Sequence, residues 1–268
     1  MEKFIFDSGR QRPYLTVSTS DRTALDTICT MRQAAYDGAD AFMIHLEKLD
    51  KQYFNEKDLR EVFSFAGSRP IATLNYSDNR SEKADEELAE GQLTAIAAGS
   101  GCCDIMADMF DPRPEQMTRD PKAVKRQEEL IQIIHSLGAQ VLMSTHLWNF
   151  TEPKRVVEQL QEMEARGADI VKVAMRVEKP EQMRDAINLT MALKENLQVP
   201  FLHICAGKYG KAHRILSPLL GSCMVLCVEK YTPRSNKDKP LLKAVHSIYD
   251  ALDWMPCRYE WNKEIASP

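Results

Sequence analysis

The sequence predicts an α/β protein folded as a single (β/α)8 barrel of the TIM type, and three observations support this prediction. Short apolar runs rich in β-branched residues alternate with amphipathic stretches along the chain, and eight such runs can be counted. Each run is followed by a helical stretch, as parallel strands joined by crossover helices require. A length of 268 residues is ordinary for one such barrel.

The competing fold is a doubly wound open sheet, which normally has fewer strands and often carries a glycine motif that binds phosphate. Gly207 and Gly210 are separated by two residues and do not form that motif. The strand count therefore favours the barrel.

The predicted strands share a short, apolar, β-rich composition. They span residues 14–18, 41–45, 71–74, 104–108, 140–144, 170–174, 201–204 and 224–228. The predicted helices span residues 23–36, 56–65, 82–98, 121–137, 151–166, 180–197, 212–220 and 241–252. Pro121 at a helix start and Gly38 and Gly99 after helix ends are the expected boundary residues.

We expect one domain over residues 1–268, because no composition shift or low-complexity stretch divides the chain. Residues 1–12 are expected to form either a strand or a cover beneath the barrel floor. Residues from about 256 to 268 are expected to form a tail.

Composition excludes several classes of protein. A net charge of -4 gives no reason to expect nucleic acid or an anionic membrane as a partner. There is no apolar run of about 18 residues and no signal-peptide pattern at the N-terminus, so a cytoplasmic protein is expected. Seven cysteines without a Cys-x-x-Cys pair argue against a zinc site and a disulfide framework, and no ligand cluster implies a metal or cofactor.

Lys172 lies inside one of the buried strands, where an ammonium group loses its hydration. Burial lowers the pKa of an amine, and a neutral amine is a nucleophile that can form an imine with a ketone or aldehyde. Side chains alternate along a strand, so Ile170, Lys172 and Ala174 share one face, and Val171 and Val173 suit the face toward the helices. Lys172 is therefore expected to point into the barrel; the alternative is a lysine that extends to solvent.

His146 follows the preceding strand and is a candidate general acid–base for that imine chemistry. In a barrel the site lies at the C-terminal ends of the strands. Residues expected near this rim are His45, Asn75, Asp108, His146, Lys172 and the loop after Ile204. His45 and His203 can face the same cavity, and for each a structural role is favoured over a catalytic one.

Three segments together resemble the type I 3-dehydroquinate dehydratase family, Schiff-base lyases of the shikimate pathway of aromatic amino acid biosynthesis. Residues 167–172 (Gly-Ala-Asp-Ile-Val-Lys) resemble the strand of the family's imine-forming lysine. Residues 143–146 (Met-Ser-Thr-His) resemble its catalytic histidine segment. Residues 207–210 (Gly-Lys-Tyr-Gly) followed by Arg214 resemble the loop and arginine that hold the substrate carboxylate. The resemblance implies catalysis by Lys172 and His146, a homodimer, and no metal or cofactor.

The sequence also departs from the family at positions that contact substrate. Met43 and His45 stand where the second strand normally carries Glu and Arg. Asn75 replaces the Arg that ends the third strand, and Asn79 stands at the place of a later Glu. The closing loop of the family reads Ser-x-Pro-Gly-Gln; here residues 232–236 read Thr-Pro-Arg-Ser-Asn, with Ser235 as the substrate-binding candidate and the register of residues 232–239 open.

Three functions from different classes remain open. The first is a dehydratase acting on 3-dehydroquinate or a related carboxylated hydroxyketone, a small-molecule partner that Arg214 would bind. The second is a class I aldolase or transaldolase-like lyase, in which residues 207–210 would hold phosphate. The third is a catalytically weak regulatory relative. The order His146, Lys172, Arg214 along the chain favours the dehydratase.

Overall fold

The computed structural model describes residues 1–6, 10, 12–75, 84–233 and 235–252. Eight parallel strands form one sheet in the order β7-β6-β5-β4-β3-β2-β1-β8. The strands are β1 (Tyr14–Thr19), β2 (Ala41–His45), β3 (Ile71–Leu74), β4 (Cys102–Met106), β5 (Gln140–Leu147), β6 (Ile170–Arg176), β7 (Phe201–Ala206) and β8 (Met224–Cys227). The predicted (β/α)8 barrel is confirmed.

The ring closes through the first and last strands of the chain. Tyr14 pairs with Met224 and Val17 with Cys227, in parallel register. β7 and β8 are the two ends of the strand order, and the backbone N–H of Cys223 donates to the carbonyl of Phe201 at 2.8 Å between them. The sheet is therefore nearly closed on itself.

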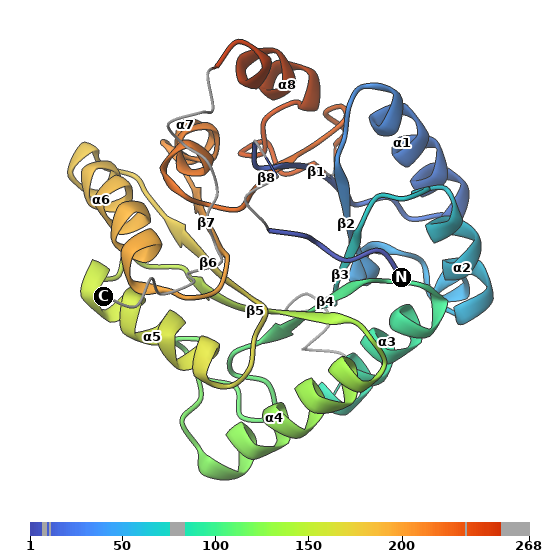
Figure 1. The fold of residues 1–268 in the computed structure, drawn as a ribbon, viewed down its shortest axis with the longest axis horizontal. Helices are drawn as coiled ribbons and strands as arrows, with labels where there is room; N and C mark the ends of the chain where they lie inside the picture. The colour runs from blue at the N-terminus through green and yellow to red at the C-terminus, as the bar shows by residue number, and fades with distance from the viewer. Residues whose placement is uncertain (7–9, 11, 76–83, 234, 253–268) are drawn as a thin grey trace, which may run out of the picture.

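The helices lie on the outside of this ring, as Figure 1 shows. They are α1 (Ala24–Tyr36), α2 (Glu56–Ser64), α3 (Asp85–Ala98), α4 (Pro121–Ser136), α5 (Pro153–Ala165), α6 (Pro180–Asn196), α7 (Gly210–Leu216) and α8 (Leu242–Asp250), with short 3-10 helices η1 (Leu46–Lys48), η2 (Lys51–Tyr53) and η4 (Ser217–Leu220). No helix in the described segments is long and apolar enough to cross a membrane.

Alternation along β2 shows how each strand serves two layers. Phe42 and Ile44 pack with Leu59 of α2 in the layer between strands and helices. Met43, which lies between them in the strand, belongs to a different cluster of buried residues that includes Leu74. Because side chains of a strand point alternately to its two faces, the inward positions of neighbouring strands meet inside the barrel.

The N-terminal residues cover the end of the barrel opposite to the strand C-termini. The backbone N–H of Phe4 donates to Gln140 at the start of β5, at 2.8 Å, and Phe4 packs edge-on against Tyr14 at the start of β1. A Cβ on Gly101 would lie 1.9 Å from the carbonyl oxygen of Glu2, so the close approach of this segment requires glycine there. Residues 1–6 contain no strand, and residues 256–268 lie outside the described part of the chain.

The observed elements differ from the predicted ones mainly at the C-terminal ends of strands. β4 spans Cys102–Met106 rather than residues 104–108, so Asp108 lies in the following loop and Asp104 lies within the strand. β5, β6 and β7 run two or three residues further than predicted, to Leu147, Arg176 and Ala206. These extensions carry polar side chains into the mouth of the barrel, where hydrophobic periodicity gives no signal.

Candidate active site

A cavity of about 310 Å³ opens at the C-terminal ends of the strands. Its walls combine residues from strands far apart in the sequence, including His45 of β2, His146 of β5 and Lys172 of β6. Arg214 of α7 and Lys239 of the loop before α8 also line it. A concave, partly apolar site with convergent titratable groups is the usual form of an enzyme active site.

Lys172 lies at the bottom of this cavity and is 1% exposed. It is paired in the sheet with Ser144 of β5. Its amine nitrogen Nζ lies 3.1 Å from Oδ2 of Asp104, and the hydroxyl of Ser144 donates to Oδ1 of the same carboxylate at 2.6 Å. Lys172 thus points into the barrel, as the alternation of β6 predicts.

Asp104 supplies the negative charge that a buried lysine needs. Burial raises the pKa of the Asp104 carboxyl, while the charge of Lys172 and the hydrogen bond from Ser144 act in the opposite direction. Two buried, oppositely charged groups stabilise each other, and removal of either leaves an uncompensated charge. The pair holds the Lys172 amine in one place at the base of the cavity.

His146 lies at the mouth of the same cavity, two residues beyond Ser144 on the inward face of β5. Oε1 of Gln116 accepts hydrogen bonds from the backbone N–H of His146 at 2.9 Å and from its ring nitrogen Nδ1 at 3.0 Å. Nδ1 therefore carries the ring proton, which leaves the lone pair on Nε2. Burial, followed by the positive charge of Lys172, lowers the pKa of His146 well below its ordinary value. A neutral imidazole of this tautomer is a general base.

Gln116 adopts an unusual backbone conformation, with φ of 47°. Such a left-handed conformation is unfavourable for a residue with a side chain, by about 1 kcal/mol or more. It lies in the loop between β4 and α4, and its amide oxygen is the acceptor that fixes the tautomer of His146.

A second set of hydrogen-bonded polar side chains lies at another part of the cavity wall. Nδ1 of His45 lies 2.6 Å from Glu47, and Nε2 lies 2.9 Å from the hydroxyl of Ser18. Lys239 donates to the same hydroxyl at 2.6 Å. Burial, together with the charge of Lys239, lowers the pKa of His45, against the opposing effect of Glu47. The imidazole is thus neutral, with Nδ1 donating to Glu47.

Arg214 of α7 is 4% exposed and lines the cavity. Its Nε donates to the carbonyl of Cys205 at 2.9 Å, which fixes the plane of the guanidinium group. A fixed, planar guanidinium can bind a carboxylate through two parallel hydrogen bonds.

The comparisons with known proteins agree with this geometry. The sequence model of type I 3-dehydroquinase matches residues 17–253, which is most of the chain. The chain belongs to this family.

Curated relatives of this chain are 3-dehydroquinate dehydratases, and each matches it over a shorter stretch than the family model does. A 3-dehydroquinate dehydratase of Alkaliphilus oremlandii is 32% identical over 107 residues, 39% of this chain and 42% of that protein. One of Klebsiella pneumoniae is 26% identical over 152 residues, 54% of this chain and 56% of that protein. The chain thus spans about half the length of the curated relatives it matches.

Solved structures of the family share the fold. A 3-dehydroquinate dehydratase of Geobacillus kaustophilus has a TM-score of 0.76 at 14% identity, covering 89% of this chain and 90% of that one. The type I enzyme of Clostridium difficile, solved with covalently modified comenic acid, also has a TM-score of 0.76, at 17% identity, covering 90% and 92%.

Four of the site residues predicted from the sequence line one cavity: Lys172, His146, Arg214 and His45. The other three lie outside its lining. Met43 is buried in the apolar core, and Asn75 donates to the carbonyl of Leu88 at 3.2 Å. Ser235 bonds to Thr232 within its own loop; from that loop, Asn236 and Lys239 reach the cavity instead.

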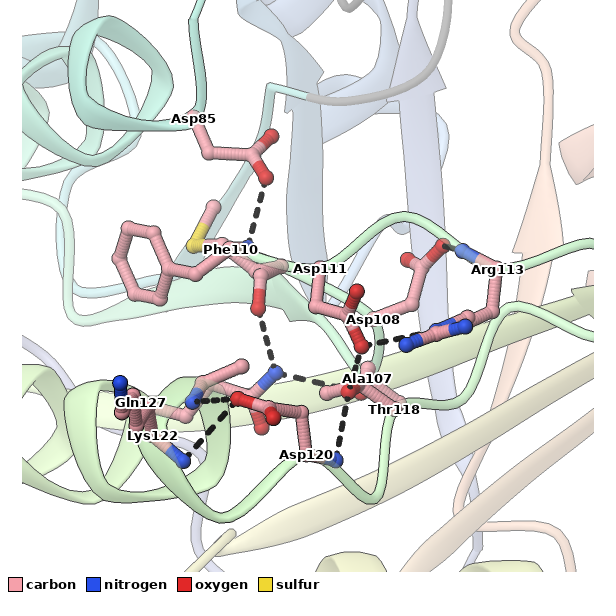
Figure 2. Close-up of polar contacts among 12 residues, drawn as sticks. Asp85, Ala107, Asp108, Phe110, Asp111, Arg113, Thr118, Asp120, Lys122 and Gln127 are labelled. Atoms are coloured by element: carbon pink, nitrogen blue, oxygen red, sulfur yellow. Dashed lines mark hydrogen bonds and ion pairs between the residues drawn. The ribbon is translucent and has the colours of Figure 1, made fainter.

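Asp108 and His203 are also held away from the cavity. Asp108 accepts a hydrogen bond from the backbone N–H of Arg113 at 2.9 Å and belongs to the polar network of the β4–α4 loop shown in Figure 2. His203 faces the helices. Its Nδ1 lies 2.9 Å from the hydroxyl of Thr190, and Nε2 of His213 lies 3.3 Å from the same hydroxyl. With Cys205, these two histidines form a buried group that lies behind β7.

Four residues of the site have no counterpart among the residues singled out from the sequence: Asp104, Gln116, Glu47 and Lys239. A signal existed for Asp104, because it is one of two charged residues in the predicted strand 104–108, and the observed strand, Cys102–Met106, has it at its centre. Gln116, Glu47 and Lys239 lie in loops or a 3-10 helix, where hydrophobic periodicity gives no signal. Only the fold brings Glu47 and Lys239 to the cavity and Gln116 to His146.

Proposed function

We propose that the protein is an imine-forming dehydratase that removes water from a carboxylated ring ketone bearing a hydroxyl group. The observation that carries this proposal is one cavity that contains a buried lysine paired with Asp104, a neutral histidine with a defined tautomer, and an arginine suited to a carboxylate. Membership of the type I 3-dehydroquinase family and a relative with a covalently modified ligand support it.

The reaction begins when Lys172 passes a proton to the Asp104 carboxylate, whose pKa burial raises, and the neutral amine Nζ attacks the ketone carbon. The carbonyl oxygen leaves as water after proton transfer, and a protonated imine forms between the carbon and Nζ. The positive iminium acidifies the neighbouring C–H bond. Nε2 of His146 removes that proton, and the electron pair shifts into the ring to form an enamine.

Expulsion of the β-hydroxyl follows. His146, now protonated, gives its proton to the hydroxyl, which leaves as water as the enamine electrons form the new C=C bond. Hydrolysis of the resulting conjugated iminium releases the enone and restores the Lys172 amine. His146 begins and ends neutral, and the net change is the loss of one water molecule. Arg214 holds the substrate carboxylate throughout.

Borohydride trapping tests this function. Reduction of the imine in the presence of 3-dehydroquinate, or of simpler carboxylated ring ketones, should add the ketone's mass, less one water and plus a hydride and a proton, to the peptide that contains Lys172. Lys172→Met should abolish both trapping and turnover. Lys208→Met is the matched control, because Lys208 is exposed on the β7–α7 loop and does not line the cavity. Trapping on Lys239 in place of Lys172 would overturn the assignment.

The aldolase alternative is tested in the same assay. It predicts trapping with phosphorylated ketones and cleavage of a carbon–carbon bond. Loss of water without carbon–carbon cleavage supports the dehydratase. The absence of any imine with carboxylated ketones would favour the non-catalytic relative.

A further inference from the structure

We propose that Lys239 is an anion-binding residue and that, with Arg214, it forms a two-cation seat for the acidic group of the substrate. The inference rests on the proposed function only in taking the cavity as the substrate site. It goes beyond that function by assigning a role to a lysine in a loop where the family pattern does not place one.

Lys239 is held in a defined position by its own loop. Its backbone N–H donates to the carbonyl of Asn236 at 3.1 Å, and its carbonyl accepts from the hydroxyl of Tyr231 at 3.0 Å. The preceding residue, Asp238, accepts from the backbone N–H of Gly207 at 3.1 Å, which ties this loop to the loop that leads into α7. Arg214 lies on α7, so the loop that carries Lys239 is tied to the loop that leads into the helix of Arg214.

The amine of Lys239 contacts neutral groups. It donates to the hydroxyl of Ser18 at 2.6 Å and lies 3.4 Å from Nε2 of His45. Lys239 is buried, with 8% of the residue exposed, and no carboxylate among the described residues forms an ion pair with its amine. Glu47, which lies nearby, is bonded to Nδ1 of His45 at 2.6 Å.

This arrangement contrasts with that of Lys172 in the same cavity. Asp104 supplies a counter-charge to Lys172 at 3.1 Å, whereas nothing described in the structure does so for Lys239. A buried ammonium without a counter-charge is costly, and an anionic ligand beside it would supply the missing charge. Ser18, His45 and Glu47 act as positioning residues, because they hold the amine at the wall of the cavity.

The charges around Lys239 lead to the same conclusion. Burial, and next the positive charges of Arg214 on α7 and Lys172 on β6, lower the pKa of Lys239 to about 7, against smaller opposing effects of Glu47 on η1 and Cys227 on β8. His45, which also faces it, is neutral. A bound anion favours the charged amine, so its binding should raise this pKa and draw a proton from solution above neutral pH.

Two ligands that differ only in charge test the seat: cyclohexanecarboxylate and cyclohexanecarboxamide. Neither has a ketone, so neither can form an imine. We expect the protein to prefer the carboxylate, and Lys239→Met to weaken carboxylate binding by about 10- to 100-fold, as the loss of a charged hydrogen bond predicts. Binding of the carboxamide should change little. Lys239→Arg should restore part of the preference, and Lys208→Met should retain all of it.

Calorimetry in two buffers of different ionisation enthalpy adds a measurement that needs no variant. Carboxylate binding at pH 8 should take up close to one proton, binding at pH 5.5 should take up almost none, and the carboxamide should take up none at either pH. A carboxylate preference that is equal in Lys239→Met and the unaltered protein, or binding without proton uptake at pH 8, would overturn the proposal.

The outcome is independent of the imine. Lys172→Met should keep the carboxylate preference, because Asp104 and Lys172 do not form the seat. If trapping fails on Lys172 but the preference depends on Lys239, the proposed reaction is wrong and the seat stands. If trapping succeeds on Lys172 and the preference survives Lys239→Met, the reaction stands and the seat is wrong.

Discussion

The amine nitrogen of Lys172 lies 3.1 Å from a carboxylate oxygen of Asp104, and both side chains are 1% exposed. The pair joins β4 to β6 across β5, where Ser144 contributes the second hydrogen bond to the carboxylate. A buried pair of this kind is costly to break from one side, because the partner left behind keeps its charge.

This coupling predicts a non-additive double-mutant cycle. Asp104→Leu alone should lower the free energy of unfolding by about 3–5 kcal/mol, as the loss of one partner of a buried ion pair does. Lys172→Met alone should also be destabilising. The double variant should be more stable than the sum of the two single changes predicts, by roughly 1–3 kcal/mol. Urea unfolding at pH 7 provides the three values, and strict additivity would show that the two charges are not coupled.

His146 should separate imine formation from turnover. His146→Ala lacks the general base but leaves Lys172 in place, so we expect borohydride trapping to persist. Turnover should fall by about 10²- to 10⁴-fold. Trapping and steady-state assays on the same preparation make the comparison. Turnover close to that of the unaltered protein would assign His146 a structural role.

Gln116 should set the pH range over which His146 works. The neutral ring is the active form of a base, and its pKa lies well below the ordinary value, so activity should persist into acidic pH. In Gln116→Glu the added negative charge favours the protonated ring, and the acidic limb of the kcat/KM profile should move to higher pH. Gln116→Leu should lower turnover by about 10-fold through loss of the fixed tautomer. An unmoved limb in Gln116→Glu would show that this contact does not affect the base.

The substituted positions predict altered substrate preference. Met43 is apolar and Asn75 is bonded to a backbone carbonyl, so neither provides a charged partner for the ring hydroxyls of 3-dehydroquinate. We expect kcat/KM for 3-dehydroquinate to lie below about 10⁴ M⁻¹s⁻¹, the lower end of the range for natural substrates. A carboxylated ring ketone with fewer or different hydroxyls should be converted faster. Enone absorbance measures both rates, and an ordinary value for 3-dehydroquinate would refute the prediction.

The histidines behind β7 predict acid sensitivity. Burial lowers the pKa of His213 from 6.5 to about 4, and the pKa of His203 is lowered as well. The unfolded chain therefore binds protons that the folded protein does not, and stability falls as pH drops from 6.5 toward 4. His213 alone should account for a loss on the order of 3 kcal/mol across this window.

Urea unfolding at pH 7 and pH 4.5 measures this loss. His213→Gln should reduce the difference between the two pH values, whereas His135→Gln, which removes an exposed histidine paired with Asp169, should not reduce it. An equal pH dependence in both variants would contradict the assignment.

Much of the fold follows from local patterns in the sequence. Residues 41–45 and 71–74 are predicted as strands with the observed bounds, because their apolar composition and flanking glycine or proline are local properties. The direction of Lys172 also follows from the sequence, since β-branched valines occupy the alternate positions of its strand.

The composition of the site was decided by tertiary structure. Asp104 and Lys172 are 68 residues apart, and Ser18 and Lys239 are 221 apart, yet each pair is in contact. Hydrophobic periodicity indicates which face of a strand or helix is buried, but not which distant side chain packs against that face. It therefore predicted the strand of Lys172 without its partner Asp104, and it gave no signal for Lys239 in a loop. The sequence by itself determined eight strands, their helices and an inward-pointing Lys172. Only closure of the ring, which brings β1 beside β8 and gathers the strand ends at one mouth, decided which charges surround that lysine.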